Sequence, residues 1–125
     1  MISLDIGVMA TMAGGSEHLL LFTRSYCERM AKIALNKSIK AELDIYNVGG
    51  LTMEADYQSR KGLLASPYWF CFPLGVAANQ NVTSYSPKNL MHYVDQLPRD
   101  SMFMAFGFNE KAILAAVQAT FLEVV

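Results

Sequence analysis

The feature that most constrains this sequence is a fourfold repeat, in which an apolar segment of strand length is followed by a segment with helical periodicity. The predicted strands are residues 2–9, 39–47, 67–75 and 101–107. Each repeat spans about 30 residues, which is typical of βαβ units with parallel strands. The repeat predicts an α/β fold of about four consecutive βα units with parallel strands, which is half of a (β/α)8 TIM barrel. An open, doubly wound sheet of four strands is the alternative.

Local signals predict the structure between these strands. Residues 10–17 are predicted to form a flexible loop around Gly14 and Gly15, and residues 18–22 a short extended segment. Helices are predicted to begin at Ser25, at residue 52, at Ser86 with Pro87, and at Asn109. The side chains predicted to be buried on the first and last helices are Tyr26, Met30, Ile33 and Ala34, and Ile113, Val117 and Phe121. Pro73 lacks a backbone donor, so strand pairing is predicted to end near Phe72.

Composition limits the class of protein. With 125 residues, of which 53% are hydrophobic and 17% charged, the chain is predicted to form a single domain over residues 1–125. A net charge of −1 argues against nucleic acid as a partner, and the apolar stretches are shorter than the ~20 residues that a membrane helix needs. Cys27 and Cys71 have no metal-site spacing, so they are interpreted as buried free thiols of a cytoplasmic protein.

Polar residues with chemical potential gather on the second predicted strand. Its alternation places Leu43 and Ile45 on one side and Glu42, Asp44 and Tyr46 on the other. An amide and two glycines follow at residues 47–50, where parallel α/β folds place their functional groups. Two interpretations stay open: the glutamate lines a substrate pocket or is an interior carboxylate paired with a lysine, and the amide orients a ligand or shapes the turn.

The order of several short motifs resembles the β-keto acid cleavage enzymes, a family that includes the 3-keto-5-aminohexanoate cleavage enzyme. The motifs are Ser-Leu-Asp-Ile-Gly (3–7), Lys-Ala-Glu-Leu-Asp-Ile-Tyr-Asn (40–47), Pro-Leu-Gly-Val (73–76), Gln-Leu-Pro (96–98) and Ala-Phe-Gly-Phe (105–108). The resemblance covers residues 1 to about 122. It implies a zinc-dependent (β/α)8 barrel that converts a β-keto acid and acetyl-CoA into acetoacetate and a shorter acyl-CoA.

The resemblance also implies roles for individual residues. Glu42 falls at a substrate-contacting glutamate, Asp5 near a position that commonly holds a hydroxyl residue, and Asn47 where an aspartate is usual. These three are the predicted substrate-binding residues, and Gly75 and Gly107 are the predicted coenzyme-binding residues. In the family, zinc is held by a His-x-His pair and a late acidic residue. No metal ligand is therefore predicted in this chain, because its histidines, His18 and His92, are far apart in the sequence.

We therefore expect a fragment of the barrel that lacks its N-terminal and C-terminal parts and is inactive alone. The alternatives are a half-barrel subunit completed by a partner chain and a small α/β ligand-binding domain. Residues 2–8 and 101–106 are predicted to be the unpaired outer strands. Because both are apolar, we expect self-association into a homo-oligomer.

Overall fold

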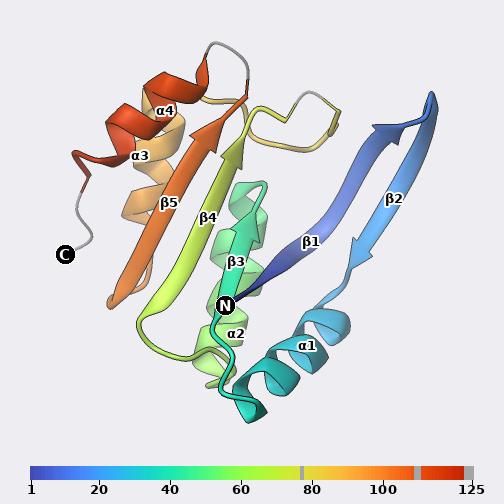
Figure 1. Cartoon of the computed structure of the whole chain (residues 1–125), viewed down its shortest axis with the longest axis vertical. Coiled ribbons are helices and arrows are strands. Elements are labelled where there is room, and N and C mark those ends of the chain that lie inside the picture. The colour runs from blue at the N-terminus through green and yellow to red at the C-terminus, as the bar shows by residue number, and fades with distance from the viewer. Residues whose placement is uncertain (77, 109–110, 123–125) are drawn as a thin grey trace.

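A computed structural model describes residues 1–76, 78–108 and 111–122 of the chain. The strands are β1 (Ile2–Ala13), β2 (Ser16–Phe22), β3 (Ala41–Ile45), β4 (Tyr68–Leu74) and β5 (Ser101–Gly107). The helices are α1 (Arg24–Asn36), the π-helical segment η1 (Gly50–Ala55), α2 (Asp56–Arg60), α3 (Pro87–Asp95) and α4 (Ala112–Ala119). This alternation confirms the predicted α/β fold (Figure 1).

The strands form one sheet in the order β2-β1-β3-β4-β5. The strands β1, β3, β4 and β5 are parallel, and each lies beside the next of these along the chain. A (β/α)8 barrel has this order of neighbours, but the sheet is open, so a partial barrel stays a prediction.

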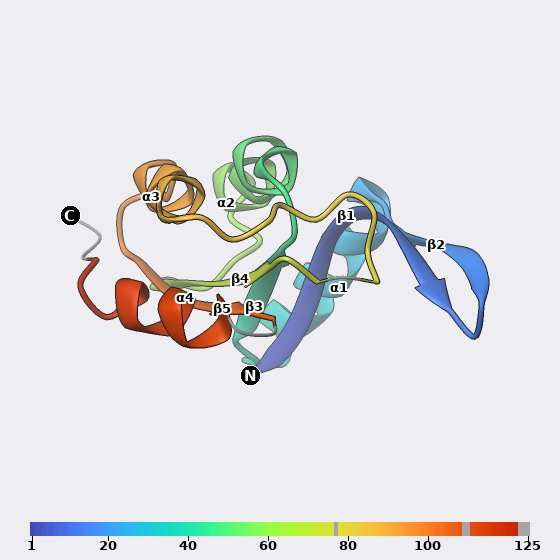
Figure 2. The ribbon, with the colours of Figure 1, turned by 90° about the horizontal axis from the view of Figure 1, so that it is seen from above.

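The loop predicted at residues 10–17 is wrong, because β1 continues into an antiparallel hairpin with β2. Ala13 pairs with Ser16, and the two residues between them, Gly14 and Gly15, have φ values of +58° and +79°. Positive φ at both central residues is the geometry of a type I′ hairpin turn, which glycine adopts without strain. The hairpin projects from the body of the molecule (Figures 1 and 2). It also corrects one of the two predicted edges, since β2 and not β1 is the outer strand on this side, whereas β5 is the other outer strand, as predicted.

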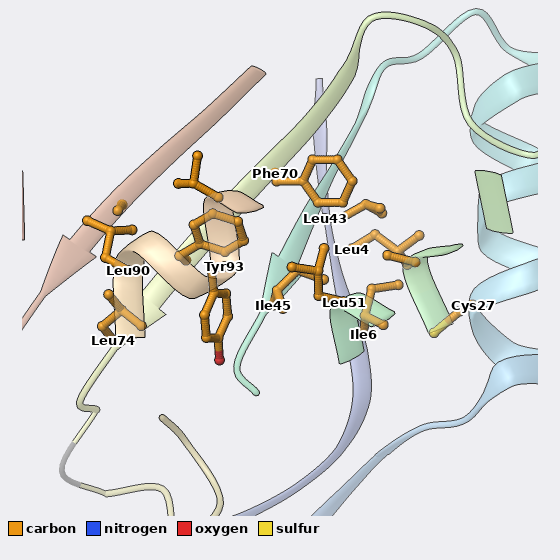
Figure 3. Packing of buried hydrophobic residues seen from close by; sticks show 14 of the residues in the cluster. Leu4, Ile6, Cys27, Leu43, Ile45, Leu51, Phe70, Leu74, Leu90 and Tyr93 are labelled. Atoms are coloured by element: carbon orange, nitrogen blue, oxygen red, sulfur yellow. The ribbon is translucent and has the colours of Figure 1, made fainter. Parts of the chain in front are cut away.

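The core lies between the sheet and the helices on one of its faces. Figure 2 shows α2 and α3 on the same side of the sheet. The alternating apolar residues of the central strands point to this side: Leu4, Ile6, Leu43, Ile45, Phe70 and Phe72. They pack with Cys27 of α1, Leu51 of η1 and Tyr93 of α3 (Figure 3).

Helix α1 differs from its prediction in its start and in one residue of its buried face. The Thr23 hydroxyl, rather than Ser25, accepts the capping hydrogen bond, which comes from the backbone N–H of Tyr26 at 3.4 Å. Its buried residues are Cys27, Ala31 and Ala34, whereas Ile33 is 44% exposed. Ala34 is buried as predicted, and Tyr26 and Met30 pack against the core while partly buried, so Ile33 is the exception.

Two local predictions further along the chain are confirmed. Ser86 caps α3 by accepting from the backbone N–H of Asn89 at 3.1 Å, with Pro87 in the first turn. Gly62 follows α2 with a φ of +66°, as expected for a glycine after a helix C-terminus.

In the second half of the chain, two predictions are wrong and one cannot be compared with the structure. Strand pairing passes Pro73, which lies opposite Phe106, and continues to Leu74 opposite Gly107. Pro73 removes only its own N–H, so the neighbouring ladder bonds survive. The predicted buried stripe of α4, Ile113, Val117 and Phe121, is 51–81% exposed, because the helix packs through Ala115 instead. The predicted cap Asn109 lies outside the described residues.

Candidate functional site

The candidate site is the sheet face opposite the core, which we call the open face. Side chains alternate along a strand, so the residues between the core positions point to this face. The open face comprises Ser3 and Asp5 of β1, Glu42 and Asp44 of β3, Trp69, Cys71 and Pro73 of β4, and Met102, Met104 and Phe106 of β5. The polar groups therefore lie on β1 and β3, and the apolar groups on β4 and β5.

Three potential ligand groups converge at the centre of the open face. The carboxylates of Glu42 and Asp44 and the thiol of Cys71 each offer an atom within 4.8 Å of the other two. We call these three residues the donor cluster. The strand register explains the cluster, because Asp44 lies opposite Cys71 and Glu42 opposite Trp69. The Ser3 hydroxyl donates a hydrogen bond to Asp44 from the neighbouring strand.

Asp5 lies beside the donor cluster, in the same row as Asp44. Its carboxylate accepts a hydrogen bond from the Tyr46 hydroxyl at 2.8 Å. Burial is the main cause that raises the pKa of Asp5; the Tyr46 hydrogen bond opposes the rise and the charge of Asp44 adds to it. Burial also raises the pKa of Glu42, and Asp44 again adds to the rise. Both groups therefore hold protons more strongly than ordinary carboxyls.

The interpretation of Glu42 as one half of a lysine pair finds no support among the described residues. Their ion pairs join Arg24 to Glu54, Lys32 to Glu28 and Arg60 to Asp56. Lys40, two residues from Glu42, donates instead to the carbonyl oxygens of Ala65 and Pro67. A carboxyl with a raised pKa and no cationic partner can serve as a proton donor or acceptor in general acid–base chemistry.

Cys71 is 2% exposed, and both it and Cys27 are free, buried thiols as predicted. Burial raises the pKa of Cys71, and the charge of Asp44 raises it further. The sulfur therefore stays protonated at neutral pH unless a cation replaces the proton. This environment disfavours a role as a free nucleophile.

The structure separates the predicted site residues into two groups. Glu42 and Asp5 share the open face. Asn47 lies beyond the end of β3, where its side-chain oxygen accepts from the Gly50 N–H at 3.0 Å and its amide nitrogen donates to the Asn81 carbonyl at 3.4 Å. These contacts favour the interpretation that Asn47 shapes the turn.

The two predicted coenzyme-binding glycines lie at strand ends against the chain's own backbone. Gly75 has a φ of +74° and donates its N–H to the Thr83 carbonyl at 2.9 Å. A side chain at Gly107 would meet the Lys111 carbonyl oxygen at 3.0 Å. Both positions therefore need glycine for local packing or conformation, whether or not a ligand approaches them.

Sequence reasoning missed Cys71 and gave Asp44 too little weight. The alternation of β3 already placed Asp44 beside Glu42, so its signal was present. Cys71 lies in a nearly continuous apolar segment, and only the pairing of β3 with β4 shows that its side chain meets the carboxylates.

A cavity of about 150 Å³ lies next to the open face, along β1 and α1. Its lining residues include Ser3 and Asp5 of β1, together with Phe22 and the α1 residues Tyr26 and Met30.

Comparison with known proteins gives one family. A family model described as "beta-keto acid cleavage enzyme" matches residues 1–123. No curated protein matches the chain. Among the described residues, no helix has both the length and the apolar character needed to cross a bilayer.

Proposed function

The chain belongs to the beta-keto acid cleavage enzyme family, and we propose that its open face forms part of the pocket in which a β-keto acid reacts with acetyl-CoA. In this reaction the acetyl group is transferred to give acetoacetate, and the rest of the acid leaves as an acyl-CoA. The observation that carries the proposal is Glu42, a partly buried carboxyl with a raised pKa. The resemblance implies that this residue contacts the substrate.

Glu42 can contribute to this chemistry in either protonation state. As a carboxylic acid it donates a hydrogen bond to a keto or carboxylate oxygen, and as a carboxylate it accepts a proton from the carbon between two carbonyl groups. Asp5 has a positioning role, because the Tyr46 hydroxyl fixes its carboxylate beside the cavity. Protonation also matters for binding, since an anionic β-keto acid would be repelled by three ionised carboxylates.

Zinc is the metal that the resemblance implies, although the His-x-His pair expected to hold it is not in this sequence. The donor cluster is a different set of residues, for which no metal role was predicted, and it fits zinc chemically. Two carboxylates and a thiol are ligand types that zinc accepts, and their separation of up to 4.8 Å lets them converge on one ion after small side-chain movements. Glu42, Asp44 and Cys71 would hold the ion in this chain, and a bound zinc would supply Lewis acidity toward a carbonyl oxygen. With the ion bound, Glu42 would be a metal ligand in place of a proton donor or acceptor. A cation here would also neutralise the carboxylates that otherwise repel the acid.

We further propose that the chain alone does not turn over substrate at an appreciable rate. The His-x-His pair that the resemblance implies is absent from the sequence, whose histidines are His18 and His92. The acetyl-CoA site is proposed near the carboxyl ends of β4 and β5, where Gly75 and Gly107 lie. Binding therefore tests the function of the open face more directly than turnover does.

Acetoacetate is the probe for the experiment, with amide chemical shifts as the measurement. We expect shifts in β1 and β3 and a weakening of binding of about tenfold in Glu42→Gln, the loss that one charge-assisted hydrogen bond carries. Glu28→Gln is the matched control, because Glu28 lies on α1 and pairs with Lys32. Equal binding by the wild type and Glu42→Gln would contradict the proposal. Separately, repeated conversion of a longer β-keto acid and acetyl-CoA into acetoacetate and an acyl-CoA by the zinc-loaded chain would overturn the claim of inactivity.

A further inference from the structure

Thr83 lies in the segment between β4 and α3, and it makes hydrogen bonds to three different elements. Its backbone carbonyl accepts from the N–H of Gly75, the residue directly after β4, at 2.9 Å. Its hydroxyl accepts from the Tyr93 hydroxyl of α3 at 2.7 Å. Its own N–H donates to the carbonyl of Tyr46, the residue directly after β3, at 2.8 Å. Thr83 therefore ties the carboxyl ends of two neighbouring strands to a helix of the core layer.

The Tyr93 hydroxyl holds the side chain of Thr83 from the core. Tyr93 is fully buried, and its ring packs edge-on against Phe72 with ring centroids 4.9 Å apart. The core thus fixes the ring, and the hydroxyl points out of the apolar cluster (Figure 3). A phenylalanine ring would fill the same space in the core, so what the hydroxyl adds is the bond to Thr83. Because a buried hydroxyl without a partner destabilises the native state, this bond is maintained.

Tyr46 carries the connection from Thr83 to the open face. Its carbonyl accepts from Thr83, and its side-chain hydroxyl donates to the Asp5 carboxylate on β1 at 2.8 Å. Tyr46 is therefore held both at its backbone and at the tip of its side chain. The network runs from α3 through Thr83 and Tyr46 to Asp5, and every link joins two residues within positions 5–93. It does not depend on either outer edge of the sheet.

We propose that Thr83 is a positioning residue for the open face, because it holds the backbone of Tyr46 where the tyrosine hydroxyl can orient the Asp5 carboxylate. The inference rests on the proposed function, in which the open face binds a β-keto acid. A carboxylate in a fixed orientation needs no reordering when the acid binds, so loss of this constraint weakens binding. Thr83 acts only through Tyr46, since it is not a residue of the open face.

The carbon NMR signal of the Asp5 side-chain carboxyl reports the hydrogen bond from Tyr46. Tyr46→Phe removes this bond and sets the reference change in the signal. Thr83→Val and Tyr93→Phe are each expected to shift the signal in the same direction by a smaller amount, because either one removes the bond that holds the Thr83 side chain. Thr83→Ser keeps the hydroxyl and should leave the signal unchanged.

Tyr85→Phe is the matched control for the loss of a buried hydroxyl. Tyr85 lies in the same segment, is 8% exposed, and donates its hydroxyl to the Gln118 side chain at 3.0 Å. If the variants merely loosened the segment, Tyr85→Phe would move the Asp5 signal as much as Tyr93→Phe does, and this result would overturn the proposal. An unchanged Asp5 signal in both Thr83→Val and Tyr93→Phe would also overturn it.

A double variant tests whether the effect on binding passes through Tyr46. With acetoacetate as the probe, Thr83→Val is expected to bind about threefold more weakly than the wild type. The double variant Tyr46→Phe/Thr83→Val should bind no more weakly than Tyr46→Phe alone, and additive losses would overturn the proposal. A wild type that does not bind acetoacetate would refute the proposed function, whereas the Asp5 signal would still decide whether Thr83 acts on Asp5.

Discussion

The ionised forms of Asp5 and Glu42 are destabilised, because both carboxyls are partly buried and lie near the charge of Asp44. Burial is the first cause of the raised pKa of each, and Asp44 adds repulsion. A carboxyl whose pKa is raised by folding stabilises the fold fully at pH values below its unfolded pKa. That stabilisation is lost as the pH rises through the folded pKa. The ionised carboxyls of the site therefore lower the free energy of unfolding at neutral pH, as is common at functional sites.

Replacing Asp5 by Asn or Glu42 by Gln should therefore raise the melting temperature at pH 7, by about 2–4 °C. The amide oxygen of Asn still accepts the Tyr46 hydrogen bond, so the change removes mainly the charge. The gain should shrink as the pH falls, because a growing fraction of the wild-type carboxyls is then protonated. Thermal unfolding at several pH values is the measurement. Glu28→Gln should not show this gain, because the hydrogen bond from Lys32 is the main cause that lowers the pKa of Glu28.

The two thiols allow a matched test of the donor cluster. Cys71 lies in the cluster, whereas Cys27 is equally buried on the core side, where its thiol contacts the Asp5 and Phe22 carbonyls. Cobalt(II) in place of zinc gives a charge-transfer absorption only when a thiolate binds it. We expect this absorption in the wild type and in Cys27→Ala, and its loss in Cys71→Ala. Absorption that survives in Cys71→Ala would remove Cys71 from the proposed ligand set.

At the scale of elements, the capping residue next to a helix determines where that helix begins. Ser86 is expected to contribute about 1 kcal/mol to the free energy of unfolding, because Ser86→Ala leaves the Asn89 N–H without its acceptor. Ser25→Ala is the control, since Thr23 caps α1, and its effect should stay within about 0.5 kcal/mol. Urea unfolding measures both. A larger loss in Ser25→Ala than in Ser86→Ala would mean that the caps are misassigned.

The elements also show how far sequence reasoning reaches. Short-range signals were sufficient for Ser86 and Gly62, because the residues that decide those helix ends are adjacent in the chain. They failed where the partner is distant: Ile33 and Val117 have good helical spacing, but their exposure depends on which side the sheet approaches. The two glycines Gly14 and Gly15 are compatible with a hairpin turn as well as with a flexible loop, and the pairing of Ala13 with Ser16 decides for the turn. In the site, Glu42 and Asp5 followed from alternation and resemblance, whereas Cys71 required the strand order.

At the scale of the whole molecule, the projecting hairpin is joined to the body by the segment after β4. Asn81 makes two of these connections, since its side chain accepts from the Ala10 N–H at 3.1 Å and donates to the Val8 carbonyl at 2.7 Å. The backbone adds two more, from Met12 to Ala78 and from Gln80 to Ala10. The β1–β2 hairpin therefore depends on polar contacts, whereas β3 lies between two parallel strands over the core.

Different contacts imply different local stabilities, which hydrogen exchange can resolve. Asn81→Ala removes two hydrogen bonds, so opening of the hairpin should become about tenfold more frequent. We expect faster exchange in β2 and in the paired part of β1, with unchanged exchange in β3. Asn89→Ala is the control, because it also removes a side-chain bond to a carbonyl, that of Ser84, but far from the hairpin. Uniformly faster exchange in Asn81→Ala would show that hairpin and core open as one unit, contrary to the contacts that separate them.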